Sequence, residues 1–312
     1  MIVDAHTHIM REIRGTRRGE VPTTGAGLGR VQVGDDLEVW MPPSFERSVA
    51  TAEMLVRYLD WLQIDGAVLL QAPCYGDQLP YLREVVRSYP GRFVTVALVD
   101  PRDSRRASVH VETVAAYPEV VGVKFEVPDT PFLMDAPEHA PLWRRIVEAD
   151  LLATIDLGWH DGPFDGHVDR LSAVLERYST LQVVVAHLGV SRLWDRNQLA
   201  PFPVLRQTLR RLSGFPGVVF DIAGLPFFCP EEEYPYPRAQ EIISVAVELV
   251  GPDRLMWGSD FPTVLQHCTY RQVLDLVRNH VALDRESLAL LLGRTAERVY
   301  RFDRVRANLH SV

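Results

Sequence analysis

The sequence predicts an α/β fold, a (β/α)8 barrel of the TIM-barrel type, on two observations. Short and almost continuously apolar stretches alternate with stretches of helical periodicity, and this alternation occurs eight times along the 312 residues. Continuous apolar strands are typical of parallel sheets covered on both faces, and eight βα units close a TIM barrel. The alternative is an open doubly wound sheet, which would usually have a glycine-rich phosphate loop after the first strand. This chain has His-Thr-His at that place.

Eight segments are expected to be strands, because Val, Ile, Leu and Phe dominate them and turn residues or helical stretches bound them. In chain order these segments are 2–6, 65–73, 92–101, 120–128, 151–158, 181–189, 217–226 and 254–262.

Helices are expected between the strands, where apolar residues recur with a spacing of three and four. These segments are 48–63, 81–90, 104–117, 139–149, 165–178, 201–213 and 237–250. Extra helical segments follow the last strand, at 269–281, 284–292 and 294–302. We therefore expect one barrel domain over residues 1–312, with additional C-terminal helices.

Two connections are longer than a turn requires, and both follow the C-terminal end of a strand. Residues 9–45 contain several arginines, Arg17 among them, and residues 224–237 read GLPFFCPEEEYPYP. Function in a TIM barrel lies at this end of the strands, and long connections there usually bind or cover a ligand. We expect both connections to cover the pocket. The alternative is that they are solvent-exposed loops without a function.

The composition is typical of a protein with a large core and excludes some partners. Apolar residues make up 47% and charged residues 24%, with a formal net charge of −8. This charge disfavours nucleic acid or an anionic membrane, because phosphate binding needs a basic face. The absence of an 18-residue apolar stretch predicts no transmembrane helix, and a strand directly after Met1 predicts no signal peptide. The expected partner is a small molecule, and a homodimer is compatible with the sequence.

The cysteines indicate the compartment. Cys74, Cys229 and Cys268 are widely spaced and form no Cys-x-x-Cys pair. This pattern favours reduced thiols over a disulfide framework, so a cytoplasmic location is expected.

Histidines and an aspartate at strand ends predict a metal site. His6 and His8 are two residues apart in the first strand, so their side chains share one face. His187 ends the sixth strand in VVVAHLG, and Asp260 lies in LMWGSDFP at the end of the eighth. Alone, each has an ordinary explanation, such as a hydrogen-bonded core histidine or a helix cap. Together they would face one cavity, and such a set suits a catalytic zinc ion.

Several motifs resemble the amidohydrolase superfamily. They are VDAHTH, AHLG, MWGSDFP, YPGRFVTVALVDP, VVGVKFE and LLLGRTAERVYRF. The resemblance is strongest to the amidohydrolase-2 branch of TIM-barrel metal-dependent hydrolases, lactonases and decarboxylases. It implies that His6 and His8 bind a divalent metal, zinc or manganese. It further implies that His187 is a ligand or a catalytic residue and that Asp260 is both a ligand and the proton acceptor.

The fifth strand departs from this family pattern. Many relatives have a metal-binding histidine where this chain has Asp156 in ATIDLG, and His160 follows four residues later. Lactonase-like relatives accept another residue at this place, so the departure favours hydrolysis. The sequence leaves open whether Asp156 or His160 completes the metal site.

Lys124, in the fourth strand, has three interpretations. The resemblance allows a carboxylated lysine that bridges two metals. A fixed positive charge for a substrate carboxylate is simpler, and a structural lysine is the most ordinary explanation. With Arg17, Trp159 and His160 as further substrate-binding candidates, a cation beside a flat apolar wall predicts a small carboxylated ring compound.

The expected function is metal-dependent hydrolysis of a lactone or amide by an activated water, with Asp260 as general base and His187 as oxyanion stabiliser or ligand. The main alternative is non-oxidative decarboxylation, or hydration, of an aromatic or unsaturated acid at the same site. A metal-dependent nuclease is disfavoured by the net charge of −8. A barrel that only binds a ligand is disfavoured by the set of histidines and Asp260.

Overall fold

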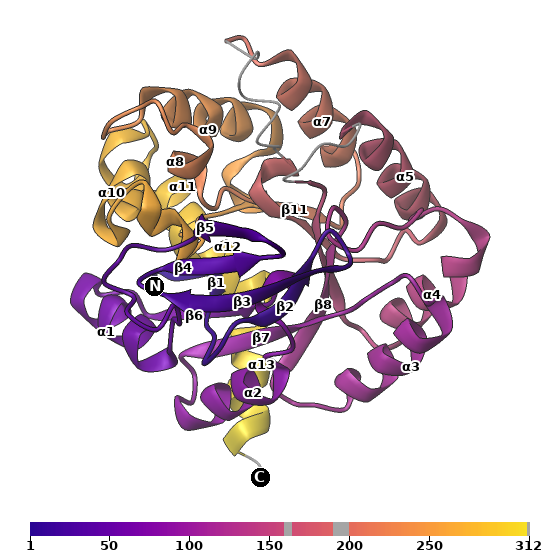
Figure 1. Ribbon diagram of the computed structural model, residues 1–312. Helices are drawn as coiled ribbons and strands as arrows, with labels where there is room; N and C mark the ends of the chain where they lie inside the picture. Colours follow the sequence, from indigo (N-terminus) through magenta and orange to yellow (C-terminus); the bar gives the residue numbers. More distant parts are fainter. Residues whose placement is uncertain (159–163, 190–199, 311–312) are drawn as a thin grey trace.

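The computed structural model describes residues 1–158, 164–189 and 200–310, and it confirms the barrel (Figure 1). Eight parallel strands form one sheet in chain order: β1 (Val3–His8), β6 (Gly66–Leu70), β7 (Phe93–Leu98), β8 (Val120–Glu126), β9 (Leu152–Asp156), β10 (Val183–Val185), β11 (Val218–Asp221) and β12 (Leu255–Met256). Backbone hydrogen bonds from Ala5 N to Trp257 O (3.0 Å) and from His8 N to Phe261 O (2.7 Å) connect the first strand to the segment that directly follows the last strand. The sheet therefore closes on itself.

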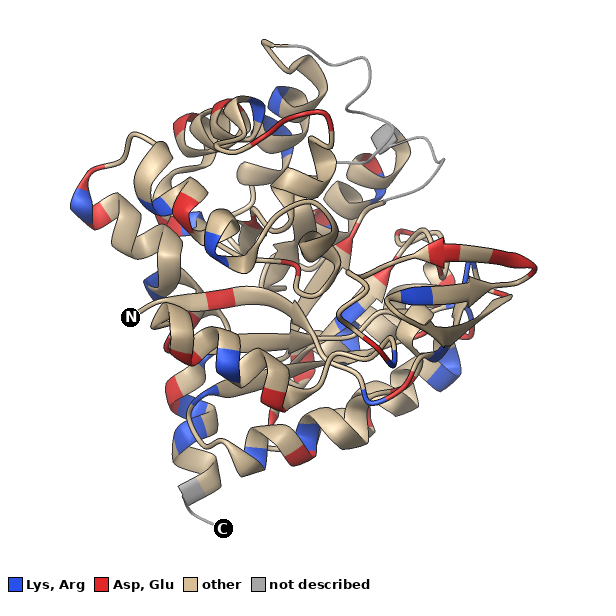
Figure 2. Ribbon diagram, turned by 60° about the vertical axis from the view of Figure 1, so that its left-hand side comes forward, with Lys and Arg blue, Asp and Glu red and all other residues tan. Residues whose placement is uncertain are grey.

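Helices surround the strands (Figure 1). They are α1 (Ala52–Leu62), α2 (Leu79–Ser88), α3 (Ser104–Ala115), α4 (Ala140–Glu148), α5 (Phe164–Arg177), α7 (Pro203–Ser213), α8 (Leu225–Phe228), α9 (Pro237–Val250), α10 (Tyr270–His280), α11 (Arg285–Ala289), α12 (Thr295–Val299) and α13 (Phe302–His310). Acidic and basic residues are interspersed along them (Figure 2). No helix among the described residues is long and apolar enough to cross a membrane.

Local sequence explains where several helices begin. Thr51 caps α1 by accepting a hydrogen bond from Met54 N, and α10 begins with a capping box formed by Thr269 and Gln272. Helices α1 and α10 each bury one side, with residues such as Leu55, Leu59, Val273 and Val277 in the core. Their other sides are solvated, as the helical periodicity predicts.

The connection after β1 is a small antiparallel sheet, which the sequence did not predict. Its strands are β2 (Arg14–Arg17), β3 (Val21–Gly27), β4 (Arg30–Val33) and β5 (Asp36–Val39). We call residues 14–40, which form this sheet and end at Trp40, the insert. Figure 1 shows the insert lying across the front of the barrel. Its strands are short, partly exposed and interrupted by glycines, so their alternation of apolar and polar residues is weak.

The segment from α11 to α13 packs where barrel strands begin: Gly293 lies against Met1, before β1, and Arg301 Nη1 donates to Asp150 O, before β9. Segments 284–292 and 294–302 were expected as two helices; α11 and α12 instead flank a π-helical turn, Leu290–Arg294. A Cβ atom on Gly293 in this turn would lie 2.4 Å from Met1 O, so only glycine allows this close approach. Helix α13 is an addition that the periodicity did not indicate.

Candidate active site

His6 and His8 are held at the end of β1, where every residue of the strand is buried. His6 Nδ1 lies 3.0 Å from Asp221 Oδ2, and His8 Nδ1 lies 3.2 Å from Leu70 O. Because both acceptors carry no proton to donate, they place the imidazole proton on Nδ1 in each ring. The two Nε2 atoms then face each other 3.2 Å apart.

His187 approaches the same point from the loop after β10. The strand ends at Val185, and His187 has a left-handed backbone with φ of 52°, which turns its ring into the barrel mouth. Its Nδ1 lies 2.9 Å from Ala223 O, so its Nε2 also carries a lone pair. The rings of His187 and His6 are 4.5 Å apart, centroid to centroid.

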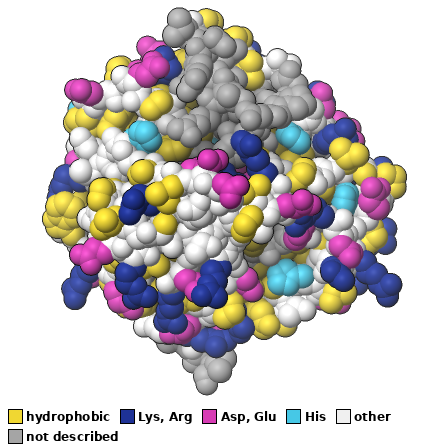
Figure 3. Space-filling view, in the orientation of Figure 1, with side chains coloured by type: hydrophobic (Ala, Val, Ile, Leu, Met, Phe, Trp, Pro, Cys, Tyr) yellow, Lys and Arg dark blue, Asp and Glu magenta, His cyan; other side chains and the backbone are white. Residues whose placement is uncertain are grey.

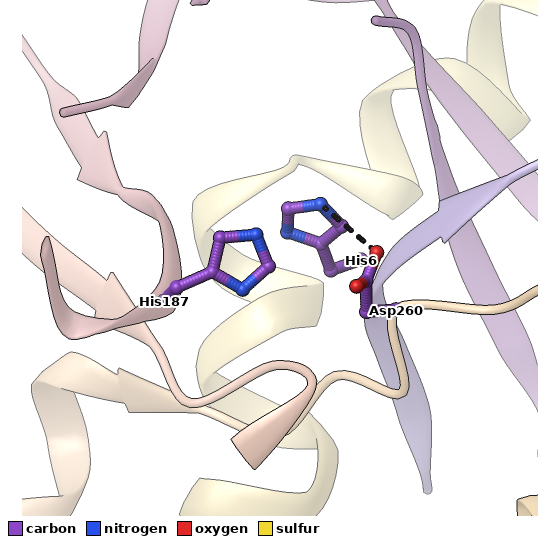
Figure 4. Close-up of side chains that lie close together, drawn as sticks. All are labelled: His6, His187 and Asp260. Atoms are coloured by element: carbon purple, nitrogen blue, oxygen red, sulfur yellow. Dashed lines mark ion pairs between the residues drawn. The ribbon is translucent and has the colours of Figure 1, made fainter. Parts of the chain in front are cut away.

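Asp260 completes the group from the segment after β12. Its φ is 62°, and its backbone N donates to His6 O at 2.9 Å, which fixes the side chain beside β1. Asp260 Oδ1 lies 3.9 Å from His6 Nε2 and 3.6 Å from His8 Nε2. Among the described residues, Oδ2 has no hydrogen-bond partner although it is buried. Figure 4 shows His6, His187 and Asp260 pointing toward a common centre.

These side chains fit a divalent metal ion. The donor atoms of His6, His187 and Asp260 all lie within 4.8 Å of one another. Burial lowers the pKa of His6 to about 4 and holds the pKa of His8 well below its usual value, so both rings are neutral at pH 7. Facing lone pairs and a buried carboxylate oxygen repel each other unless a cation lies between them. Imidazole nitrogen and carboxylate oxygen are the ligands that zinc accepts.

Asp221 is a residue of the site that the sequence analysis did not select. Its Oδ2 accepts from His6, and its Oδ1 accepts from the backbone N of His187 at 2.8 Å and of Ala223 at 3.1 Å. The His6 ring and these donors keep the pKa of Asp221 low despite its burial. An aspartate that ends the apolar strand VVFD was the available signal, but its partners lie on other strands.

Lys124 forms a buried ion pair with Glu126, and Asp156 adjoins this pair. Lys124 Nζ lies 2.8 Å from Glu126 Oε2. Burial raises the pKa of Glu126 to about 7, and the nearby Asp156 carboxylate adds to this increase. Asp156 Oδ1 accepts from Gly158 N at 2.9 Å, and its Oδ2 is 3.8 Å from His187 Nε2. The charge of Lys124 is thus balanced by the protein, which favours the structural interpretation.

A pocket of about 170 Å³ lies above the candidate metal ligands. Of the sequence-predicted residues it contains His6, His8, Arg17, Lys124, Asp156, His187 and Asp260. The other two, Trp159 and His160, lie outside the described residues. The insert and the connection after β11 both reach this pocket, through Trp40 and Phe227 respectively. Their expected position over the site is therefore confirmed.

Comparison with known proteins identifies the family. The family model for amidohydrolases (Amidohydro_2) matches residues 3–302. An L-fucono-1,5-lactonase from Burkholderia multivorans is 24% identical over 311 residues, covering 96% of this chain and 95% of that protein. A solved amidohydrolase from Burkholderia multivorans with bound Zn has a TM-score of 0.72 and 22% identity, over 96% of this chain and 99% of that chain.

A 5-carboxyvanillate decarboxylase from Sphingomonas paucimobilis has a similar fold over less of the chain. Its TM-score is 0.59 and its identity 17%, over 82% of this chain and 84% of that chain. Hydrolases and a decarboxylase thus share the architecture described above. Because the family model covers nearly the whole chain, this protein belongs to the amidohydrolase family.

Proposed function

We propose that this protein hydrolyses the ester bond of a small lactone, with a divalent metal held by His6, His8, His187 and Asp260. The observation that carries the proposal is that donor atoms of His6, His187 and Asp260 lie within 4.8 Å of one another in one pocket, with His8 Nε2 3.2 Å from His6 Nε2. The similarity to a lactonase over nearly the full length of both chains supports it. Zinc is the candidate metal.

A divalent cation in such a site supplies Lewis acidity, which polarises a carbonyl and acidifies water. The chain's own residues supply the proton transfer. Asp260 accepts a proton from the attacking water as the new C–O bond forms at the carbonyl carbon. When the ring C–O bond breaks, the same carboxyl group returns the proton to the leaving alkoxide oxygen. The product is an open-chain hydroxy acid, so that one water is consumed for each ring opened.

The charges of the pocket favour an uncharged substrate. The sequence suggested a carboxylated one, because Lys124 and Arg17 were expected near the pocket. Both reach it, but Lys124 is paired with Glu126 at 2.8 Å and Arg17 with Glu38 at 2.5 Å. Further carboxylates line the pocket, at Asp129, Asp156 and Asp260. We therefore propose a neutral lactone, whose binding would not add a negative charge to this set.

Decarboxylation is the second candidate function, because a decarboxylase has a fold similar to that of this chain. That reaction starts from an aryl carboxylate. Among the described residues that line the pocket, Arg17 and Lys124 are the cations, and both already have carboxylate partners. A direct test compares the zinc-loaded protein on a panel of neutral γ- and δ-lactones and on hydroxybenzoates. Acid production from a lactone, lost by at least a hundredfold in Asp260→Asn, supports hydrolysis. Release of CO2 from an aryl acid without lactone hydrolysis would overturn it.

A further inference from the structure

The insert places three side chains in the wall of the pocket, and they contact one another. Arg17 comes from β2, Glu38 from β5, and Trp40 lies just after β5. Glu38 Oε2 lies 2.5 Å from Arg17 Nη1 and accepts from Trp40 Nε1 at 2.8 Å. The Arg17 guanidinium carbon is 5.8 Å from the centroid of the Trp40 ring. We call these three residues the clamp.

The insert is a fixed wall, because it is tied to three different connections of the barrel. Trp40 O accepts from Gln266 Nε2 at 2.9 Å, and Arg18 N donates to Asp129 Oδ1 at 2.8 Å. Thr23 Oγ1 donates to Cys74 O at 2.6 Å. A Cβ atom on Gly15 would lie 2.1 Å from Pro73 O, so the insert backbone also packs directly on this connection. The clamp is therefore held in place before a ligand arrives.

The clamp continues toward the candidate metal ligands through Tyr75. The rings of Trp40 and Tyr75 meet edge to face with centroids 6.0 Å apart, and Tyr75 lies 5.3 Å from the His8 ring. Tyr75 and His8 line the same pocket as the three residues of the clamp. A ring-shaped substrate whose carbonyl lies at the histidines would thus have its far side against the clamp. On the face that carries the insert, charged side chains of both signs lie among hydrophobic ones (Figure 3).

We propose that the clamp selects substrates that carry hydroxyl groups on the far side of the lactone ring. A hydroxyl both donates and accepts, and the paired Glu38 and Arg17 offer an acceptor and a donor side by side. Charge-assisted hydrogen bonds of this kind are the stronger ones, and the Trp40 ring gives an apolar wall for the C–H face of the ring. A substrate carboxylate would gain Arg17 but face Glu38, so the same geometry disfavours it.

This inference rests on the proposed lactone hydrolysis, and its test compares ratios between substrates. The probes are galactono-1,4-lactone, which is hydroxylated, γ-butyrolactone, which is bare, and paraconic acid, which carries a carboxylate. In Glu38→Gln, the kcat/KM for galactono-1,4-lactone relative to γ-butyrolactone should fall tenfold to a hundredfold, roughly the loss of one charge-assisted hydrogen bond. The relative value for paraconic acid should rise, because Arg17 loses its anionic partner.

The matched control is Asp36→Asn, which removes one negative charge from an exposed position of the same strand. It should leave both ratios within twofold of the native values. If Glu38→Gln changes all three lactones in equal proportion, Glu38 only maintains the insert and the inference is overturned.

A binding measurement tests the clamp independently of hydrolysis. Calorimetry with a panel of neutral aldopyranoses should show binding of at least one sugar to the native protein. Glu38→Gln should weaken this binding at least tenfold, while Asp36→Asn leaves it unchanged. If the native protein hydrolyses no lactone, the proposed function is wrong. The calorimetric comparison still tests whether the clamp binds hydroxyl groups. Equal affinity in Glu38→Gln, or no sugar binding to the native protein, would overturn the clamp.

Discussion

His6 Nδ1 lies 3.0 Å from Asp221 Oδ2, and this contact joins the first and the seventh strand of the barrel. The other carboxylate oxygen of Asp221 accepts from the backbone N of His187. One buried aspartate thus fixes the ring of one candidate metal ligand and the backbone of another. Such hydrogen bonds set the tautomer of a ligating histidine and raise its basicity.

Replacing Asp221 with Asn should weaken metal binding by about tenfold to a hundredfold, because the neutral amide stabilises the His6 N–H less well. Competition with a chromophoric chelator measures the affinity, and the unfolding transition verifies that the variant is folded. Unchanged affinity in a folded variant would show that Asp221 does not support the metal site.

The double variant His6→Ala, His8→Ala should lose both the bound metal and the hydrolytic activity. It removes two of the three nitrogen donors at the pocket floor. His110→Ala, His280→Ala is the matched control, since these histidines lie outside that pocket. Elemental analysis of both purified variants measures how much metal each one retains. Full metal occupancy in the first variant would contradict the assignment of the ligands.

Lys124→Met should keep the metal but destabilise the protein, because Glu126 would lose the cation that balances it in a buried position. Leaving one partner of a buried pair alone typically costs about 3–5 kcal/mol. The cost should be largest near pH 8, where Glu126 is ionised, and smaller near pH 5, where it can hold a proton. Denaturant unfolding at both pH values measures it. Loss of metal from this variant would instead favour the carboxylated lysine.

Glu126→Gln should gain stability relative to the native protein as the pH rises. Burial raises the pKa of Glu126 from 4.5 to about 7 in the folded state. Between these values the folded state holds a proton that the unfolded state has released, so the native free energy of unfolding falls with increasing pH. The glutamine variant lacks this loss, so its free energy of unfolding relative to that of the native protein should rise by up to about 3 kcal/mol between pH 4.5 and 7, whatever the constant cost of leaving Lys124 without its partner. A difference that is constant from pH 4.5 to 7.5 would refute the shifted pKa.

Much of the barrel could be predicted from sequence, because each strand and helix carries its own local pattern. All eight barrel strands lie within the expected segments or within two residues of them, as with β1 at Val3–His8 against 2–6. The insert was not predicted because its short, half-exposed strands pack on other loops of the barrel. The close contact of Gly15 with Pro73 is an example. No local pattern in residues 9–45 records that contact.

The grouping of the candidate site residues could be predicted where it depends on their place at strand ends. His6, His8, His187 and Asp260 belong to this group, and the structure brings them together. The role of Asp221 depends on how close β1, β10 and β11 bring their ends, which the sequence does not specify. Glu38 and Trp40 reach the pocket only because the insert folds back across the barrel mouth.

His6, His8, His187 and Asp260 are proposed to hold the metal on which lactone hydrolysis depends. The most direct test is the rate of hydrolysis of neutral lactones by the native protein, measured by pH-stat before and after removal of metal with a chelator. Hydrolysis should fall by at least a hundredfold on removal and return when one equivalent of zinc is added. Full hydrolytic activity in protein shown by elemental analysis to contain no metal would contradict the claim.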